Sequence, residues 1–152
     1  MIEYIGIFIA EKDTEKIIEN EKVCLAKRPK NFHCTMKYMP KDLEHFKDII
    51  GQEVVIVLTG YGNDGKNSGY RVQLQDEINK YFLNTDKNGN LKVPHITTSL
   101  ADDGKAVNTA NLNFQDLEKP IFVRGRVGAF VKDENLEYIS FEKTKLSTQE
   151  KA

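Results

Sequence analysis

The chain contains 152 residues, of which 39% are hydrophobic and 30% are charged, and it carries a formal net charge of −1. This size and composition are typical of a single globular domain that buries a substantial core. The near-zero net charge argues against a dedicated binder of long nucleic acids, which usually presents a strongly basic face. It still allows a local basic pocket that binds a small nucleotide.

Neither membrane insertion nor secretion is expected. No apolar run approaches the roughly 20 residues of a membrane-spanning helix, and the first residues have neither the basic start nor the cleavage site of a signal peptide. Cys24 and Cys34 could form one disulfide, but two cysteines do not make a disulfide framework. We therefore expect a cytoplasmic protein with no membrane contact and no obligate protein partner.

The first half of the chain is expected to alternate strands with short helices. A nearly continuous apolar run predicts a strand over residues 4–10. Apolar residues at roughly helical spacing predict helices over residues 13–26 and 42–50, which end at Pro29 and Gly51. Further strands are expected over residues 33–39, 53–59 and 70–74.

In the second half the pattern is weaker. The elements expected there are a helix or strand at 76–83, a loop at 84–90, a strand at 95–100, a short helix within 102–111 and a pair of strands at 120–131 and 136–141. The polar segment 143–152 predicts a frayed tail that follows one domain of residues 1–142. The order of these elements indicates an α+β fold with two related halves.

The triplet His-x-Thr occurs twice and uses two of the three histidines. Motif 1 is His33–Thr35 and motif 2 is His95–Thr97, and each begins a predicted strand. Side chains alternate between the faces of a strand, so the His and Thr of one motif share a face, while the apolar centre, Cys34 or Ile96, points the other way. One copy alone would be explained more simply as strand packing, but two copies favour a functional pair.

Two His-Thr pairs suit chemistry on a phosphodiester that needs no metal and no cofactor. Imidazole titrates near neutral pH, so one histidine can act as a base while the other acts as an acid. Facing each other across a groove, one would remove a proton from the attacking oxygen and the other would protonate the leaving oxygen. Thr35 and Thr97 would donate hydrogen bonds to the non-bridging oxygens.

The two motifs, with Pro94 directly before motif 2, resemble the paired signature of the 2H (two-histidine) phosphoesterases. This family includes RNA 2′,3′-cyclic phosphodiesterases, LigT-like enzymes and phage anti-CBASS nucleases. The resemblance implies a bilobal α+β fold, in which two pseudo-symmetric lobes with antiparallel sheets flank a central groove. It also implies that His33 and His95 form the acid–base pair and that Thr35 and Thr97 bind the phosphate.

The resemblance further implies a hydrolase or nuclease that cleaves 3′-5′ or 2′-5′ phosphodiester bonds of cyclic nucleotides or cyclic oligonucleotides. A phage enzyme that degrades cyclic nucleotide immune signals in the host cytoplasm is one form of this activity. The alternatives are an enzyme that processes RNA ends, either as a 2′,3′-cyclic phosphodiesterase or as a ligase, and a non-catalytic module that sequesters cyclic nucleotides. The chain has no tryptophan, on which some members stack a base, so a tyrosine or phenylalanine would have to replace it.

Five further residues are candidates for substrate contact. They are Tyr4, Lys37, Ser99, Arg124 and Phe130. By strand alternation Lys37 shares the face of motif 1 and Ser99 shares the face of motif 2. Tyr4 could stack on a base or serve only in packing, and Arg124 could bind a phosphate or remain solvated.

The same alternation turns Tyr38 away from Thr35, toward the core, unless the strand bends. A bend of this kind would bring its ring to the groove. Packing in the core is the expected role of Tyr38 because aromatic side chains usually serve packing first.

Three near-matches to other motifs are rejected. Residues 60–67 differ by one letter from a P-loop, but Asn67 stands where the magnesium-binding hydroxyl belongs, and a strand is predicted to follow where a helix is required. Residues 84–89 resemble the start of an EF-hand loop, but His95 stands in place of its bidentate glutamate. The cysteines and histidines lack the close spacing of a zinc site. We expect a hairpin at 60–67 and a turn at 84–89.

Overall fold

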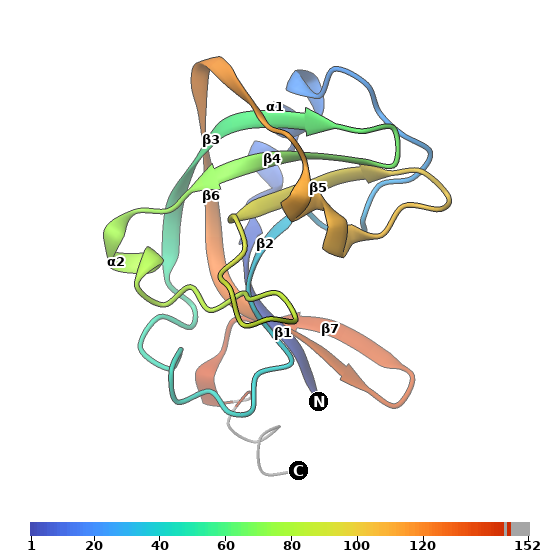
Figure 1. Ribbon diagram of the computed structural model, residues 1–152. Helices are drawn as coiled ribbons and strands as arrows, with labels where there is room; N and C mark the ends of the chain where they lie inside the picture. The colour runs from blue at the N-terminus through green and yellow to red at the C-terminus, as the bar shows by residue number, and fades with distance from the viewer. Residues whose placement is uncertain (145, 147–152) are drawn as a thin grey trace.

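The structure, a computed structural model, describes residues 1–144 and 146. Within these residues the fold is α+β, with one antiparallel sheet and a few short helices (Figure 1). The strands are β1 (Ile2–Ile9), β2 (His33–Tyr38), β3 (Glu53–Asn63), β4 (Asn67–Gln73), β5 (His95–Leu100), β6 (Gln115–Asp133) and β7 (Leu136–Ser140). The helices are α1 (Thr14–Asn20) and α2 (Asp76–Asn79), with the 3-10 turns η1 (Glu11–Asp13) and η2 (Ala106–Asn111).

The sheet brings the two motifs to its two edges. Its strand order is β2-β1-β6-β3-β4-β5, with β7 paired to β6, and neighbouring strands are antiparallel. The long β6 pairs with β3 through its first part and with β1 and β7 through its second part. Because β-sheets twist and coil, the sheet curls into a nearly closed barrel, and the edge strands β2 and β5 approach each other. This curling is what brings residues 33–35 close to residues 95–97.

Backbone hydrogen bonds cover both edge strands. The N–H of Leu83 donates to the carbonyl of Met36 on β2 at 2.9 Å. On β5, Leu100 and Lys27 exchange two backbone hydrogen bonds of 2.8 and 2.9 Å. Edge strands with free backbone groups are sites of unwanted pairing, so these contacts protect the strands that carry the motifs.

The hydrophobic core is one cluster of buried side chains from the sheet, the helices and the turn segment 40–52. The fully buried members include Ile5, Ile7, Ile17, Met36, Ile56, Leu58, Val123 and Val127. Strand alternation separates this core from the functional face: on β1, Ile5 and Ile7 are buried, while Tyr4 points to the opposite side and lines a pocket.

Most predicted strands are confirmed, and the differences lie mainly in the helices and in β6. The helix predicted over 13–26 ends at Asn20, and residues 42–50 form consecutive turns in which the predicted apolar face is nevertheless buried. Strand β6 begins at Gln115, before the predicted start at residue 120. The two lobes were expected to have sheets of their own, but the strands form one continuous sheet because β6 pairs on both sides.

At the C-terminal end the packed chain extends past the predicted domain boundary at residue 142. Leu146 is fully buried in the core, and its N–H donates to the carbonyl of Glu142 at 3.2 Å. The rest of the predicted tail, residues 145 and 147–152, lies outside the described residues. In the part of the chain that the structure describes, no helix is both long and apolar enough to cross a membrane.

Candidate active site

A pocket of about 920 Å³ contains both motifs. His33 and Thr35 reach it from β2, and His95 and Thr97 reach it from β5. Its other lining residues come from β1, the end of β2, the segment 84–92 and η2: Tyr4, Tyr38, Asn84, Thr85, Asp86, Lys87, Lys92, Ala106, Val107, Asn108 and Asn111. The structure therefore brings together the four residues that the sequence predicts to be catalytic.

The side chain of Asn31 fixes the ring of His33. The Nδ1 atom of His33 lies 2.9 Å from Oδ1 and 3.3 Å from the backbone oxygen of Asn31. Both oxygens of Asn31 only accept hydrogen bonds, and the hydroxyl of Tyr4, 3.5 Å from Nδ1, can accept as well, so Nδ1 carries the proton of the neutral ring and donates to them. The lone pair of Nε2 is then available to a ligand, which is the state that a general base needs.

Motif 2 repeats this arrangement. The Nδ1 atom of His95 lies 2.8 Å from the backbone oxygen of Val93, two residues before it, as Asn31 is two residues before His33. The neutral His95 therefore also carries its proton on Nδ1 and leaves Nε2 available. Two imidazoles with the same orientation relative to their own strands thus line one pocket.

Both imidazoles are neutral near pH 7 in the free protein. Burial lowers the pKa of His33 to about 4; the hydrogen bond to Asn31 acts against this, and the nearby charge of His95 adds to it. Burial also lowers the pKa of His95, opposed by its bond to Val93 and reinforced by Lys92. A bound anionic phosphodiester would favour protonation of one ring, because a neighbouring opposite charge stabilises the imidazolium.

The two threonines differ in how they are held. The hydroxyl of Thr97 donates to Oγ1 of Thr109 on η2 at 2.8 Å, and Thr109 also accepts a hydrogen bond of 2.9 Å from the amide of Asn67. Thr109 is fully buried, so this chain fixes the position of Thr97. Thr35 is half-buried, and among the described residues no hydrogen-bond partner of its hydroxyl is found. That hydroxyl is available to a ligand.

Tyr4 lies in the pocket, and its ring is packed against other aromatic rings. The ring of His33 stacks on one side with a centroid distance of 4.7 Å, and the ring of Phe130 lies parallel to it at 5.3 Å. These contacts favour the packing role over base stacking, the two roles that the sequence leaves open for Tyr4. Tyr4 instead supports His33, and Phe130 supports Tyr4 from outside the pocket lining.

An irregularity in β2 exchanges the predicted places of Lys37 and Tyr38. Tyr4 pairs with Tyr38 and Gly6 pairs with Thr35, so β2 has one residue more than β1 between these two pairs. This β-bulge turns Tyr38 into the pocket, where it is 58% exposed. Lys37 is not among the pocket residues. The strand does bend, and the expectation that Tyr38 packs in the core was wrong.

A second irregularity, in β5, removes Ser99 from the pocket. Gly69 pairs with Thr97 and Ser68 pairs with Ser99, so one extra residue, Thr98, breaks the alternation. Ser99 is fully buried, and its hydroxyl donates to Glu21 at 2.7 Å. The prediction that Ser99 shares the face of Thr97 was therefore wrong.

Arg124 also lies outside the candidate active site. Its backbone N–H donates to Oδ2 of the buried Asp13 at 2.6 Å, and its guanidinium bonds the same carboxylate at 3.2 Å. Arg124 lines another pocket, of about 780 Å³, which contains neither motif. The guanidinium is already paired with the carboxylate that it would have to leave to bind a phosphate.

Sequence reasoning missed the contributions of the segment 84–92 and of η2. Residues 84–92 form a small hairpin, in which Oδ1 of Asp86 accepts hydrogen bonds from the N–H groups of Asn88 and Asn90. The hairpin brings Lys87 and Lys92 to the pocket. The asparagines and glycine around position 88 do predict a turn, but nothing in the sequence places that turn over motif 1.

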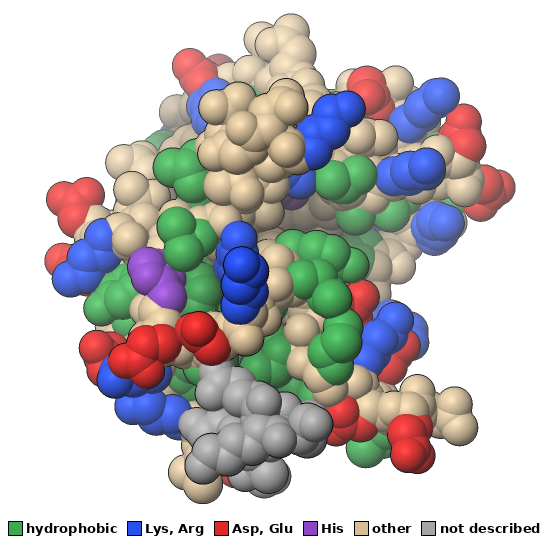
Figure 2. Space-filling view, turned by 60° about the horizontal axis from the view of Figure 1, so that its bottom comes forward, with side chains coloured by type: hydrophobic (Ala, Val, Ile, Leu, Met, Phe, Trp, Pro, Cys, Tyr) green, Lys and Arg blue, Asp and Glu red, His purple; other side chains and the backbone are tan. Residues whose placement is uncertain are grey.

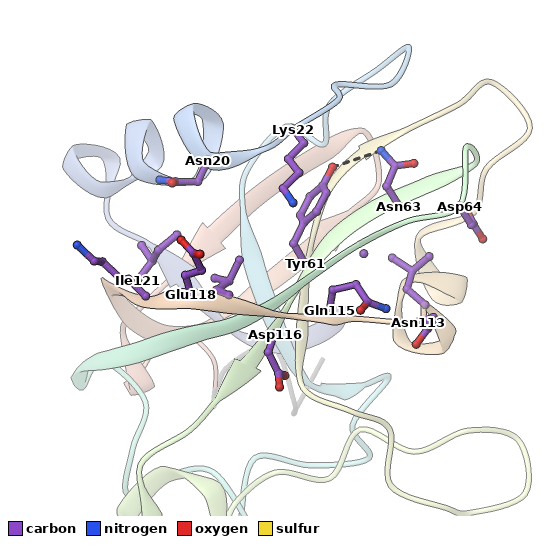
Figure 3. Close-up of a pocket in the computed structure, with 14 residues that line it drawn as sticks. Asn20, Lys22, Tyr61, Asn63, Asp64, Asn113, Gln115, Asp116, Glu118 and Ile121 are labelled. Carbon is purple, nitrogen blue, oxygen red and sulfur yellow. Dashed lines mark hydrogen bonds between the residues drawn. The ribbon is translucent and has the colours of Figure 1, made fainter.

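Another pocket, of about 850 Å³, lies against β3 and the first part of β6 (Figure 3). Lys22 and Tyr61 point into it, and the amide of Asn63 donates to the hydroxyl of Tyr61 at 3.3 Å. Neither motif lines this pocket. Of these three pockets, only the pocket of about 920 Å³ is lined by histidines.

Residues 60–67 and 84–89 form the predicted hairpin and turn. Residues 60–67 form the end of β3, a turn and the start of β4, and Asn67 is a buried residue that donates to Thr109. Among the described residues, no three or more His, Cys, Asp and Glu side chains are grouped so that they could hold a metal ion.

Compared with known proteins, the chain matches no family model and no curated protein.

Proposed function

We propose that the chain is a metal-independent phosphodiesterase of the two-histidine type, with His33 and His95 as its acid–base pair. The observation that carries the proposal is the pocket itself, in which two His-Thr pairs from opposite edges of one sheet meet. Each ring is held through Nδ1 by an oxygen two residues earlier, which leaves both Nε2 atoms available. A single packed histidine does not require this repeated geometry.

The residues support an in-line displacement at phosphorus. One imidazole accepts the proton of the attacking hydroxyl through Nε2, and the attacking oxygen forms a bond to phosphorus. The bond from phosphorus to the leaving oxygen breaks, and that oxygen takes a proton from the other, protonated imidazole. Thr35 donates to a non-bridging oxygen as its charge grows. Thr97 does the same once its hydrogen bond with Thr109 is reversed, so that Thr109 donates and Thr97 accepts. When the attacking group is a ribose 2′-hydroxyl, the products are a 2′,3′-cyclic phosphate and a free 5′-hydroxyl.

The substrate class that we propose is a cyclic nucleotide or cyclic oligonucleotide with 3′-5′ or 2′-5′ linkages. A pocket of about 920 Å³ is at the upper end of the range of small-molecule sites, so it has room for more than one nucleotide. Lys87 and Lys92 supply positive charge for additional phosphates, and the exposed ring of Tyr38 offers a stacking surface for a base. Immune-signal degradation in a phage-infected cytoplasm would be one setting for this activity.

The net charge of −1 and the mixed charges of one face favour a small substrate over a long RNA. On the face shown in Figure 2, Lys and Arg side chains are interspersed with Asp and Glu, without an extended basic area. Proteins that bind long nucleic acids need such an area to contact many phosphates.

The bilobal arrangement belongs to this proposal as well. The proposed lobe of motif 1 consists of β1, β2, β7 and the second part of β6. The lobe of motif 2 consists of β3, β4, β5 and the first part of β6. The double pairing of β6 supports this division, since β6 is the strand that both halves share.

The test is turnover, in the presence of EDTA, of 2′,3′-cyclic mononucleotides, 3′,5′-cyclic mononucleotides and cyclic di- and trinucleotides. We expect cleavage of a cyclic di- or trinucleotide, and we expect His33→Ala and His95→Ala each to lower kcat by roughly 100- to 10,000-fold. His45→Ala is the matched control, because His45 is exposed and does not line the pocket.

The other outcomes separate the alternatives. Cleavage of 2′,3′-cyclic mononucleotides alone would indicate an enzyme that processes RNA ends. Tight binding without cleavage would indicate a sequestering module. Cleavage that survives both histidine substitutions would refute the acid–base assignment.

A further inference from the structure

The side chain of Glu21 is fully buried behind β5, on the side away from the pocket. Its Oε2 atom accepts hydrogen bonds from three hydroxyls, those of Ser68 at 2.7 Å, Thr98 at 2.5 Å and Ser99 at 2.7 Å. The guanidinium of Arg28 lies 2.9 Å from Oε1. Burying a carboxylate and its partner costs several kcal/mol in desolvation, so an ion pair here is weak evidence for stability alone. The buried ion pair of Glu21 and Arg28 therefore calls for an explanation other than its contribution to stability.

The carboxylate joins the segment that precedes motif 1 to the strand that carries motif 2. Residues 21–31 run along β5: the N–H of Leu25 donates to the hydroxyl of Ser99 at 2.9 Å, and Arg28 donates to the carbonyl of Thr98 at 3.1 Å. The same segment ends at Asn31, whose side chain fixes the ring of His33. The placement of His33 relative to β5 therefore depends on the hydrogen bonds that Leu25 and Arg28 make to β5.

On the other side, β5 is held at the neighbouring residue. Thr97 points to the pocket and is bonded to Thr109, whereas Thr98, the next residue, points back and is bonded to Glu21. The network continues from Ser68 to the hydroxyl of Tyr61 at 2.7 Å. Tyr61 lines the separate pocket of about 850 Å³ that Figure 3 shows. Motif 2 is thus clamped from both faces of its strand.

We propose that Glu21 is a positioning residue that sets the placement of motif 2 relative to motif 1. This inference rests on the function proposed above. Both Nε2 atoms must reach oxygens of the same phosphodiester, so a shift of β5 against residues 21–31 lowers turnover more than it lowers binding. Misplacement by about 1 Å can reduce a rate by about 100-fold.

The experiment compares Glu21→Gln and Thr98→Val with Glu19→Gln. Glu21→Gln removes the charge of the carboxylate at nearly constant volume. Thr98→Val removes one of the hydroxyls that bind the carboxylate and keeps the shape of the side chain. Glu19 is an exposed residue of α1, so its substitution is the matched control. The measurements are kcat and KM on the substrate identified above, and the imidazole nitrogen NMR signals of His33 and His95 without substrate.

We expect Glu21→Gln and Thr98→Val to lower kcat by roughly 10- to 100-fold, with KM changed less than about threefold, and to shift the ring signals of both histidines. Glu19→Gln should change neither the kinetic constants nor the ring signals. A folded Thr98→Val protein with wild-type kcat and ring signals would overturn the inference, even if Glu21→Gln fails to fold. If the wild type cleaves no substrate, the proposed function fails, while unchanged ring signals in Thr98→Val would separately refute the positioning role.

Discussion

At the scale of single residues, the two histidines differ in the group that binds Nδ1. A side-chain amide oxygen of Asn31 accepts a hydrogen bond from His33, whereas only a backbone carbonyl does so for His95. A side chain can be exchanged and a backbone carbonyl cannot, so position 31 offers direct control over one histidine of the pair. This difference also allows the two rings to be distinguished by experiment.

Replacing Asn31 with aspartate should raise the pKa of His33 from its low value of about 4. The new carboxylate would lie at hydrogen-bond distance from Nδ1, and an opposite charge at this range favours the imidazolium by roughly 1 to 3 pH units. NMR titration of the ring measures the shift, and the limb of the pH–rate profile that His33 controls should move to higher pH. Asn31→Ala, which adds no charge, is the control; an unchanged pKa in Asn31→Asp would contradict the assigned contact.

At the scale of secondary structure elements, alternation predicted the site correctly only where pairing is regular. His33 and Thr35 share a face as expected, but the bulge that follows them reverses Lys37 and Tyr38. The extra residue Thr98 likewise turns Ser99 away from motif 2. Such bulges depend on the partner strand and not on the bulged sequence itself, so a single sequence does not show where they fall.

The bulge leads to a prediction for Tyr38. If this ring stacks on a base of the substrate, Tyr38→Ala removes an interaction of about 1 to 3 kcal/mol per base and should raise KM by roughly 10-fold or more. The value of kcat should change little, because the ring does not take part in proton transfer. Phe122→Ala is the matched control, since Phe122 is equally exposed at 58% but lies outside the pocket. Equal KM values for the two variants would refute the stacking role.

At the scale of the whole molecule, the site exists because the sheet closes on itself. Each motif could be found in the sequence, since each is local, but their meeting could not, because it depends on the curling of a sheet whose two ends carry them. The hairpin 84–92 and η2 complete the pocket only after this closure. Burial of two imidazoles is the energetic consequence, and it makes the stability of the fold depend on pH.

The free energy of unfolding should therefore fall when the pH is lowered from about 6.5 to about 4. An unfolded histidine has a pKa near 6.5, whereas His33 in the folded protein has a pKa of about 4. Between these values the unfolded chain binds more protons than the folded chain, so stability increases with pH across this window, by about 3 kcal/mol at most for His33. Burial lowers the pKa of His95 too, and its contribution has the same sign.

Carboxylates act in the same direction at lower pH. Hydrogen bonds from Arg124 hold the pKa of Asp13 below its ordinary value. Its stabilising contribution is present above the ordinary pKa of about 4 and is lost as the pH falls further.

Urea denaturation of the wild type and of His33→Gln, measured from pH 7.5 to pH 3, separates the pH range in which the histidines titrate from the range in which Asp13 titrates. His33→Gln should reduce the loss between pH 6.5 and 4, so that the contribution of His95 remains, and leave the loss below pH 4 intact. His45→Gln controls for removal of a histidine, and a wild-type slope in His33→Gln would show that His33 is not buried in its neutral form.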